Sequence, residues 1–147
     1  MPSFRVRTRV NTPMQDVWTQ FDAALLKKLS PPFPQVHIVR FDGCQTGDIV
    51  TLELNLLVAK PLWTSNITDS VQGEQACYFV DEGVEMPLGL TAWRHVHRME
   101  KRDAESTYIV DYITFKSKNW LLDYLLLPLF WGMIVYRIPF YKLYLNK

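Results

Sequence analysis

Cysteine is scarce in this sequence of 147 residues. Cys44 and Cys77 are the only two, too few for a disulfide scaffold or for a zinc site built from cysteines. A large charge of one sign is missing as well, because 16 Lys+Arg and 15 Asp+Glu leave a net charge of +1. Proteins dedicated to nucleic-acid binding usually carry a marked basic excess, so we expect no nucleic-acid partner.

Several common enzyme motifs are also missing. The sequence has no Gly-rich phosphate loop, no nucleophile elbow and no Cys–His pair. Residues 1–5 contain neither an apolar run nor a small-residue cleavage site, so no signal peptide is expected. These absences predict a reduced, cytoplasmic protein.

The composition is otherwise that of a globular domain. Hydrophobic residues make up 48% and charged residues 21% of the chain, close to the averages for folded proteins. At this length residues 1–147 are expected to form a single domain. Aromatic residues, at 14%, are the one unusual feature.

The pattern along the chain predicts a strand, two short helices and six more strands. Thr12 and Gln15 form a capping-box pattern before the helical segment, and the prolines that follow Ser30 end it. The later connections are too short for crossover helices, so the strands should pair antiparallel. The strands are expected at residues 4–10, 36–41, 49–58, 62–71, 76–84, 90–101 and 107–115.

Residues 120–145 have helical periodicity and are apolar on every side, so one long helix is expected, bent at Pro128 and Pro139. Its uncharged stretch, residues 124–136, is shorter than the ~20 residues that a bilayer requires. Asp123 and Arg137 flank that stretch and would be costly in lipid. We therefore predict no transmembrane span.

This order of elements predicts an α+β fold. The sheet must bury its apolar face, and the C-terminal helix is the long element available to cover it. We expect a curved seven-stranded antiparallel sheet wrapped around that helix, with a pocket between them.

Short motifs in a recognisable order support the same fold. They are Thr12-Pro13 before Val17-Trp18, Leu29-Ser30-Pro31-Pro32, Gly47-Asp48, Trp63, Phe79-Val80-Asp81-Glu82, Trp93-Arg94-His95-Val96-His97-Arg98, Asp111 and Tyr136-Arg137. In this order and spacing the chain resembles the SRPBCC superfamily, the helix-grip fold of START lipid-binding domains and the birch pollen allergen. Within it, the resemblance is to the small bacterial ligand-binding or cyclase/dehydrase-like proteins.

The sequence departs from that family's pattern in two places. Met86-Pro87-Leu88 stands where relatives often have Gly-Pro-Phe, and Pro139 follows the Tyr-Arg pair. Both lie near the expected pocket mouth or the helix packing, so the identity of a relative's ligand is not carried over.

The most informative constellation is on the strand over residues 90–101. Period-two alternation turns Trp93, His95, His97 and Met99 toward the pocket. The simplest interpretation is a polar patch hydrogen-bonded to Tyr112, Thr114 or backbone; the alternatives are orientation of a ligand, or a metal with Asp111 as third ligand. We expect neither metal nor cofactor.

The hairpin register decides where Asp111 lies. A loop over residues 103–106 would place Tyr112 opposite His97 and Asp111 on the outer face. A loop one residue longer or shorter would place Asp111 beside His97. The sequence leaves both registers open.

Three functions remain. The first is binding of a lipid-like, isoprenoid or aromatic molecule. The alternative is a polyketide cyclase/dehydratase-like enzyme with His95, His97, Tyr112 and Asp111 as catalytic candidates. The third is peripheral membrane contact or a homodimer through the C-terminal helix. For the first, the expected pocket wall is Trp63, Phe79, Trp93, His95, His97, Met99, Tyr112, Leu126, Phe130 and Met133.

Overall fold

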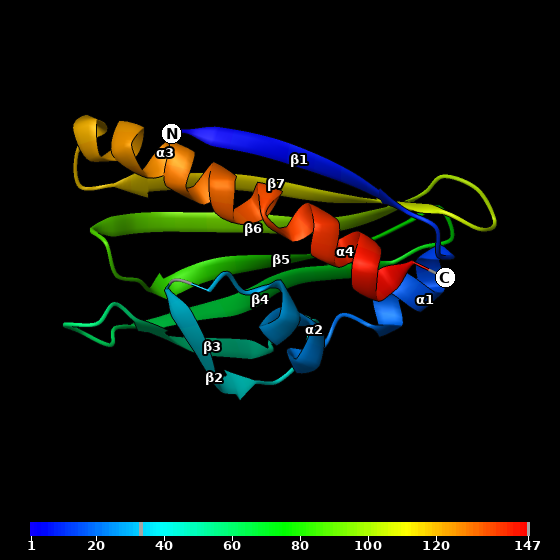
Figure 1. The fold of residues 1–147 in the computed structure, drawn as a ribbon, viewed down its shortest axis with the longest axis horizontal. Coiled ribbons are helices and arrows are strands. Elements are labelled where there is room, and N and C mark those ends of the chain that lie inside the picture. The colour runs from blue at the N-terminus through cyan, green and yellow to red at the C-terminus, as the bar shows by residue number, and fades with distance from the viewer. Residues whose placement is uncertain (33, 147) are drawn as a thin grey trace.

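One antiparallel sheet of seven strands dominates the computed structural model, which describes residues 1–32 and 34–146 (Figure 1). The strands lie in the order β1-β7-β6-β5-β4-β3-β2, so all neighbours except β1 and β7 are also neighbours in sequence. The predicted antiparallel α+β arrangement is confirmed. The strand bounds are Ser3–Val10, Gln35–Phe41, Ile49–Asn55, Leu62–Gln72, Ala76–Glu85, Leu90–Lys101 and Thr107–Ser117 for β1 to β7.

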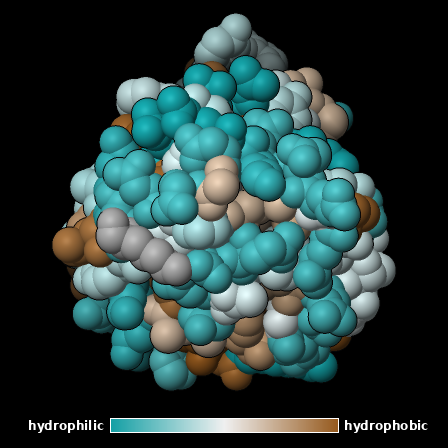
Figure 2. All heavy atoms as spheres, turned by 90° about the vertical axis from the view of Figure 1, so that its right-hand side faces the viewer, coloured by the Kyte–Doolittle hydropathy of each residue, from teal (hydrophilic) through white to brown (hydrophobic). Residues whose placement is uncertain are grey.

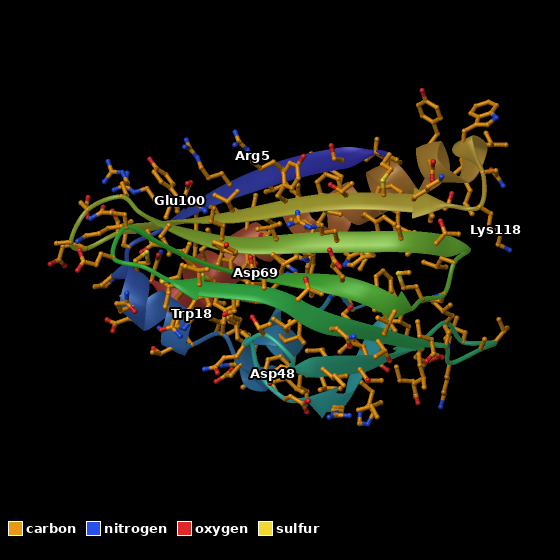
Figure 3. All side chains as sticks on the ribbon, turned by 180° about the vertical axis from the view of Figure 1, so that it is seen from behind. Arg5, Trp18, Asp48, Asp69, Glu100 and Lys118 are labelled. Atoms are coloured by element: carbon orange, nitrogen blue, oxygen red, sulfur yellow. The ribbon has the colours of Figure 1, made fainter. Side chains whose placement is uncertain are left out.

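Helices α3 (Trp120–Val135) and α4 (Arg137–Leu145) lie across one face of the curled sheet (Figure 1). Helices α1 (Met14–Thr19) and α2 (Ala23–Leu29) connect β1 with β2. The other face of the sheet carries polar side chains into solvent, among them Arg5, Asp69 and Glu100 (Figure 3). One face is therefore left for the core and for any internal site.

The expected single C-terminal helix is in fact two helices that meet at Tyr136. Pro139 gives the physical reason, because a proline ring collides with the carbonyl of the residue four positions earlier, here Val135. Helix α3 ends at that residue, and Pro139 lies in the first turn of α4, where its missing N–H costs little. Pro128 lies inside α3 without ending it.

The capping box predicted at Thr12 is wrong. Pro13 occupies the N-cap of α1 without a side-chain cap, and the Thr12 hydroxyl instead donates to the carbonyl of Leu145 at the end of α4. Of the two short helices, the capped one is α2, where the Asp22 carboxylate accepts from the N–H of Leu25 at 2.9 Å. Thr12 therefore ties the end of the C-terminal helix to the start of the first one.

The strand predicted over residues 49–58 ends three residues early, at Asn55. Leu57 has a φ of 73°, a left-handed conformation that breaks a strand and that leucine rarely adopts. Leu57 and Val58 consequently form an exposed loop tip between β3 and β4.

The core has two parts. In one, Val17, Leu29, Phe79 and Tyr141 join the short helices and α4 to the middle strands. In the other, Phe115, Phe130 and their neighbours join α3 to β1, β6 and β7. The C-terminal helices thus contribute to both parts.

Judged by length and composition alone, Trp120–Leu145 is long and apolar enough to cross a membrane. The inner side of this segment packs in the core through Leu126, Phe130, Ile134 and Tyr141. The absence of a transmembrane span stays a prediction.

Candidate functional site

The register of the β6–β7 hairpin places Asp111 on the inner face. Lys101 pairs with Thr107, so the connecting loop covers residues 102–106, one residue longer than the first of the two predicted loops. His97 therefore faces Asp111 across the strand pair. Asp111 is completely buried, and its neighbour Tyr112 points outward with 39% of its surface exposed.

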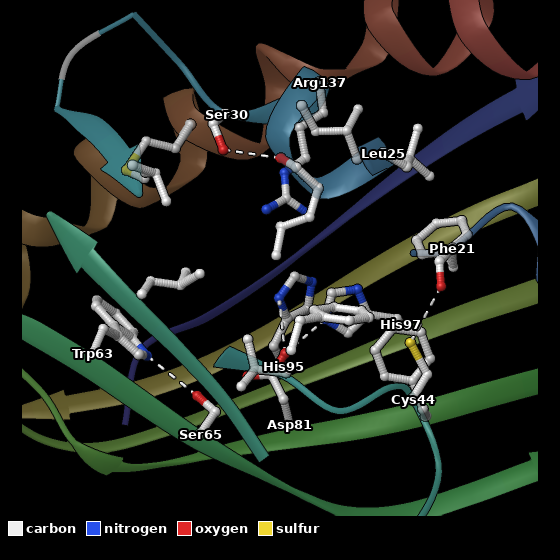
Figure 4. A pocket seen from close by; sticks show the side chains of 18 of the residues that line it. Phe21, Leu25, Ser30, Cys44, Trp63, Ser65, Asp81, His95, His97 and Arg137 are labelled. Carbon is white, nitrogen blue, oxygen red and sulfur yellow. Dashed lines mark hydrogen bonds and ion pairs between the residues drawn. The ribbon is translucent and has the colours of Figure 1, made fainter. Parts of the chain in front are cut away.

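Two histidines and two aspartates form the centre of the site (Figure 4). His97 Nε2 donates to Asp81 Oδ2 at 2.7 Å, and His95 Nε2 donates to Asp111 Oδ1 at 2.9 Å. The two imidazole rings are stacked with centroids 3.6 Å apart. In each ring the Nδ1 atom lies 3.8 Å from the carboxylate that the other ring binds. Two antiparallel His–Asp pairs thus lie side by side.

Helix α4 adds a cation and a phenol to this centre. The Tyr141 hydroxyl donates to Asp111 Oδ2 at 3.2 Å, and Arg137 Nη1 lies 4.0 Å from Asp111 Oδ1. On the sheet, the indole N–H of Trp93 donates to Asp81 Oδ1 at 3.1 Å. The fixed charges of the cluster are therefore two carboxylates and one guanidinium.

Burial and mutual contacts shift the pKa values of these groups. Burial would raise the pKa of Asp111, but the hydrogen bond and charge of His95, with Arg137, lower it to about 2. Burial and the neighbouring His95 lower the pKa of His97 to about 4, against the opposing effect of Asp81. Burial and Asp111 raise the pKa of Tyr141. At neutral pH the cluster consequently has an ionised Asp111, a neutral His97 and a protonated Tyr141.

The cluster forms one side of a cavity of about 180 Å³ between the sheet, α2 and the C-terminal helices. Arg137 points into this cavity from the helix side, toward His95 and His97 (Figure 4). Burial, together with nearby acidic groups, raises the pKa of the Cys44 thiol to about 12, so this wall residue is no thiolate nucleophile. The rest of the wall is mainly apolar and includes Phe21, Leu25, Leu29, Val50, Leu52, Leu54, Ile67 and Ile134.

The structure places the sequence-predicted wall residues in three locations. Tyr112 is a correction, because the longer hairpin loop turns it to the outer face, so it cannot serve as a cavity or catalytic residue. Met99 and Leu126 point inward but are packed in the core away from the cavity. The remaining seven line the cavity: Trp63, Phe79, Trp93, His95, His97, Phe130 and Met133.

Three members of the charged centre were not among the predicted site residues, although the sequence holds signals for them. Asp81 lies two positions after Phe79 on β5, and period two puts both on the inner face. Arg137 and Tyr141 follow Met133 at successive spacings of four, which places all three on one helix side.

Asp81, His95 and His97 could offer one ligand atom each to a metal, because these atoms lie within 4.8 Å of one another. Both Nε2 atoms, however, already donate to carboxylates. In stacked rings the in-plane lone pairs run side by side instead of converging on one point. The arrangement fits a hydrogen-bonded network better than a ligand set.

The comparisons with known proteins concern structure. No protein-family model and no curated protein sequence matches the chain. Among solved structures, the chain is similar to the Zhui aromatase/cyclase from Streptomyces sp. R1128, with a TM-score of 0.70 and 17% identity over 94% of this chain and 89% of that one. It is also similar to norcoclaurine synthase from Thalictrum flavum, with a TM-score of 0.63 and 17% identity over 93% and 83%.

A third similar structure is the protein Ara h 8.0201, with a TM-score of 0.60 and 13% identity over 95% of this chain and 96% of that one. Identities this low show a common fold, and they leave the activity of this chain open. All three matches span nearly the whole chain and agree with the sheet and helix order described above. The chain therefore shares its fold with these three proteins, which is the helix-grip arrangement predicted from the sequence.

Proposed function

We propose that the protein binds a small, mainly apolar molecule in the cavity, with one oxygen atom of that molecule between Arg137 and the two histidines. The observation that carries this proposal is the distribution of polarity in the cavity. Its walls are mainly apolar and aromatic, whereas most of the charged and titratable groups gather at one place, with Arg137 facing His95 and His97 across the space. Ligand sites have this combination of apolar wall and few orienting polar groups.

The size and lining of the cavity favour an aromatic ligand. An apolar cavity of about 150 Å³ is known to hold benzene, so about 180 Å³ suits one substituted ring. The aromatic side chains of Phe21, Trp63, Phe79 and Trp93 can pack on such a ring. The norcoclaurine synthase structure is a complex with dopamine and hydroxybenzaldehyde, which are aromatic molecules.

Blocking the cavity should abolish binding. Met133 lies on α3 and lines the cavity, so Met133→Trp should fill space that a ligand needs. We expect calorimetric titration with 4-methylphenol, a single ring with one hydroxyl, to show binding that Met133→Trp weakens by at least about tenfold. Leu129→Trp, on the exposed side of the same helix, is the matched control and should bind like the natural protein. Equal affinities of all three proteins would contradict the proposal.

The ligand itself should be sought by mass spectrometry of the purified protein, first native and then after solvent extraction. A co-purified aromatic or isoprenoid molecule would support the proposal and name its class. A co-purified long-chain lipid would contradict the preference for a single ring.

A second candidate function is proton transfer to or from the bound molecule, favoured by the buried His95–Asp111 pair at the cavity wall. A His–carboxylate pair can act as a general acid or base. His97 suits this role poorly, because a pKa of about 4 makes it a weak base at neutral pH.

The two functions differ in what happens to the ligand. If the protein is an enzyme, the extracted molecule should change in mass or isomer composition on incubation with the natural protein. His95→Gln should lower that rate by at least about a hundredfold. Recovery of the molecule unchanged from both proteins would leave binding as the function and remove catalysis.

A further inference from the structure

The outer side of α3 is apolar and uncovered. Trp120, Leu121, Tyr124 and Leu125 are exposed in its first turns, with 71% of Trp120 and 64% of Leu125 in contact with solvent. The exposed apolar side chains continue along the helix through Leu129 and Trp131. Within Trp120–Leu145, only 17% of the residues in the most apolar stretch are buried, although a helix in a protein core is mostly buried.

A second apolar element lies at the same end of the molecule. The loop between β3 and β4 projects at the end where α3 begins (Figure 1). Its tip is Leu57-Val58, and Val58 is 98% exposed, so no side chain of the described residues covers it. The opposite end, near the C-terminus, is covered mainly by hydrophilic residues (Figure 2). We call Leu57, Val58, Trp120, Leu121, Tyr124 and Leu125 the apolar end.

An exposed lysine accompanies each half of the apolar end. Lys60 lies two residues after Val58, and Lys118 lies two residues before Trp120; Lys118 projects at this end in Figure 3. Of the acidic residues here, Glu85 is exposed, whereas the Asp123 carboxylate is held by the N–H and the hydroxyl of Ser117 at 2.7 and 2.6 Å. Lys60 and Lys118 are therefore both exposed to an external anion, whereas one of these two acids, Asp123, is engaged within the protein.

We propose that the apolar end docks the protein on the surface of a phospholipid bilayer, with Lys60 and Lys118 at the level of anionic headgroups. Tryptophan, tyrosine and lysine beside exposed leucines are the composition of a membrane-interface segment. Lysine is depleted in interfaces between proteins, and a protruding, fully exposed loop tip inserts into a soft bilayer more readily than it mates with a rigid copy of itself. A bilayer therefore fits this surface better than a second copy of the chain.

The docked orientation would place the cavity close to lipid. Phe130 and Met133 line the cavity, while Leu129 and Trp131, which flank Phe130 in sequence, are exposed on the same helix. Helix α3 thus separates the cavity from the apolar surface by its own thickness. An apolar ligand dissolved in the bilayer would have a short path to the cavity, although the docking does not depend on the ligand.

The test is flotation with phosphatidylcholine vesicles and with vesicles of equal parts phosphatidylcholine and phosphatidylglycerol. The protein should float with both and more strongly with the anionic ones. Leu125→Glu and Val58→Glu should each weaken binding by at least about tenfold, because an inserted apolar side chain becomes charged. Leu143→Glu is the matched control: Leu143, on α4, is 67% exposed against 64% for Leu125, and binding should not change.

Three outcomes would overturn the proposal. One is an absence of flotation with either vesicle. Another is a concentration-dependent dimer that Leu125→Glu dissociates without vesicle binding, which would assign this surface to a second copy. The third is resistance to alkaline extraction from vesicles, which would indicate a spanning helix. All three altered positions are exposed, and unchanged circular dichroism would show that loss of binding is not loss of fold.

Discussion

Asp111→Ala should lower the free energy of unfolding by about 3–5 kcal/mol, the usual cost of removing one partner from a buried charged cluster. Asp111 is fully buried and is the common acceptor for His95 and Tyr141, with Arg137 close by. Alanine would leave a guanidinium and two hydrogen-bond donors without their carboxylate. Each buried donor or charge that loses its partner destabilises the folded state, because water cannot replace that partner.

Urea unfolding followed by tryptophan fluorescence measures this loss. Asp69→Ala is the matched control, because its carboxylate is exposed on the outer face and accepts from the Tyr78 hydroxyl and from the Ser70 N–H, within reach of water. That change should cost at most about 1 kcal/mol. Asp111→Asn keeps the shape and one acceptor oxygen, so it should fall between the two. A similar cost for Asp111→Ala and Asp69→Ala would show that Asp111 does not hold the cluster together.

The position of Asp111, unlike that of the two histidines, could not be predicted from the sequence alone. Period-two alternation placed His95 and His97 on the inner face because the charged residues Arg94, Arg98 and Glu100 share the opposite side of β6. The position of Asp111 depends instead on the length of a loop of charged and small residues, 102–106, where no hydrophobic pattern fixes the turn. One residue in that loop decides whether Asp111 or Tyr112 joins the histidines.

The break of the C-terminal helix has a similar origin. The apolar periodicity of residues 120–145 continues through Tyr136, so it indicates one helix. The backbone requirement of Pro139 is local and divides the segment at Val135. The spacing of four places Arg137 and Tyr141 on one side of the helix. The packing of α4 against β1 and α2 is the tertiary contact that turns this side toward the buried centre.

His97 should make the protein less stable as the pH falls below neutrality. It stacks on Phe79 and faces Asp81 from β5, His95 on its own strand and Asp111 from β7. Burial and His95 lower its folded-state pKa to about 4, whereas its unfolded value is 6.5. Between these pH values His97 binds a proton in the unfolded chain but not in the folded protein. Its contribution to the free energy of unfolding is therefore present above pH 6.5 and is lost toward pH 4.

The expected loss is about 2 kcal/mol between about pH 7 and pH 5, since the slope approaches about 1.4 kcal/mol per pH unit where only the unfolded chain is protonated. Urea unfolding at about pH 7, 6 and 5 would measure it, in a range above the ordinary pKa of the carboxylates. His97→Gln should remove most of this slope, whereas His37→Gln, at an exposed position, should keep it. If the unaltered protein instead gained stability toward pH 5, the prediction that His97 is neutral in the folded state would be wrong. Such a gain would mean that an imidazolium between Asp81 and Asp111 outweighs the cost of burying it, and the site would then present a cation, in place of a neutral ring, to its ligand.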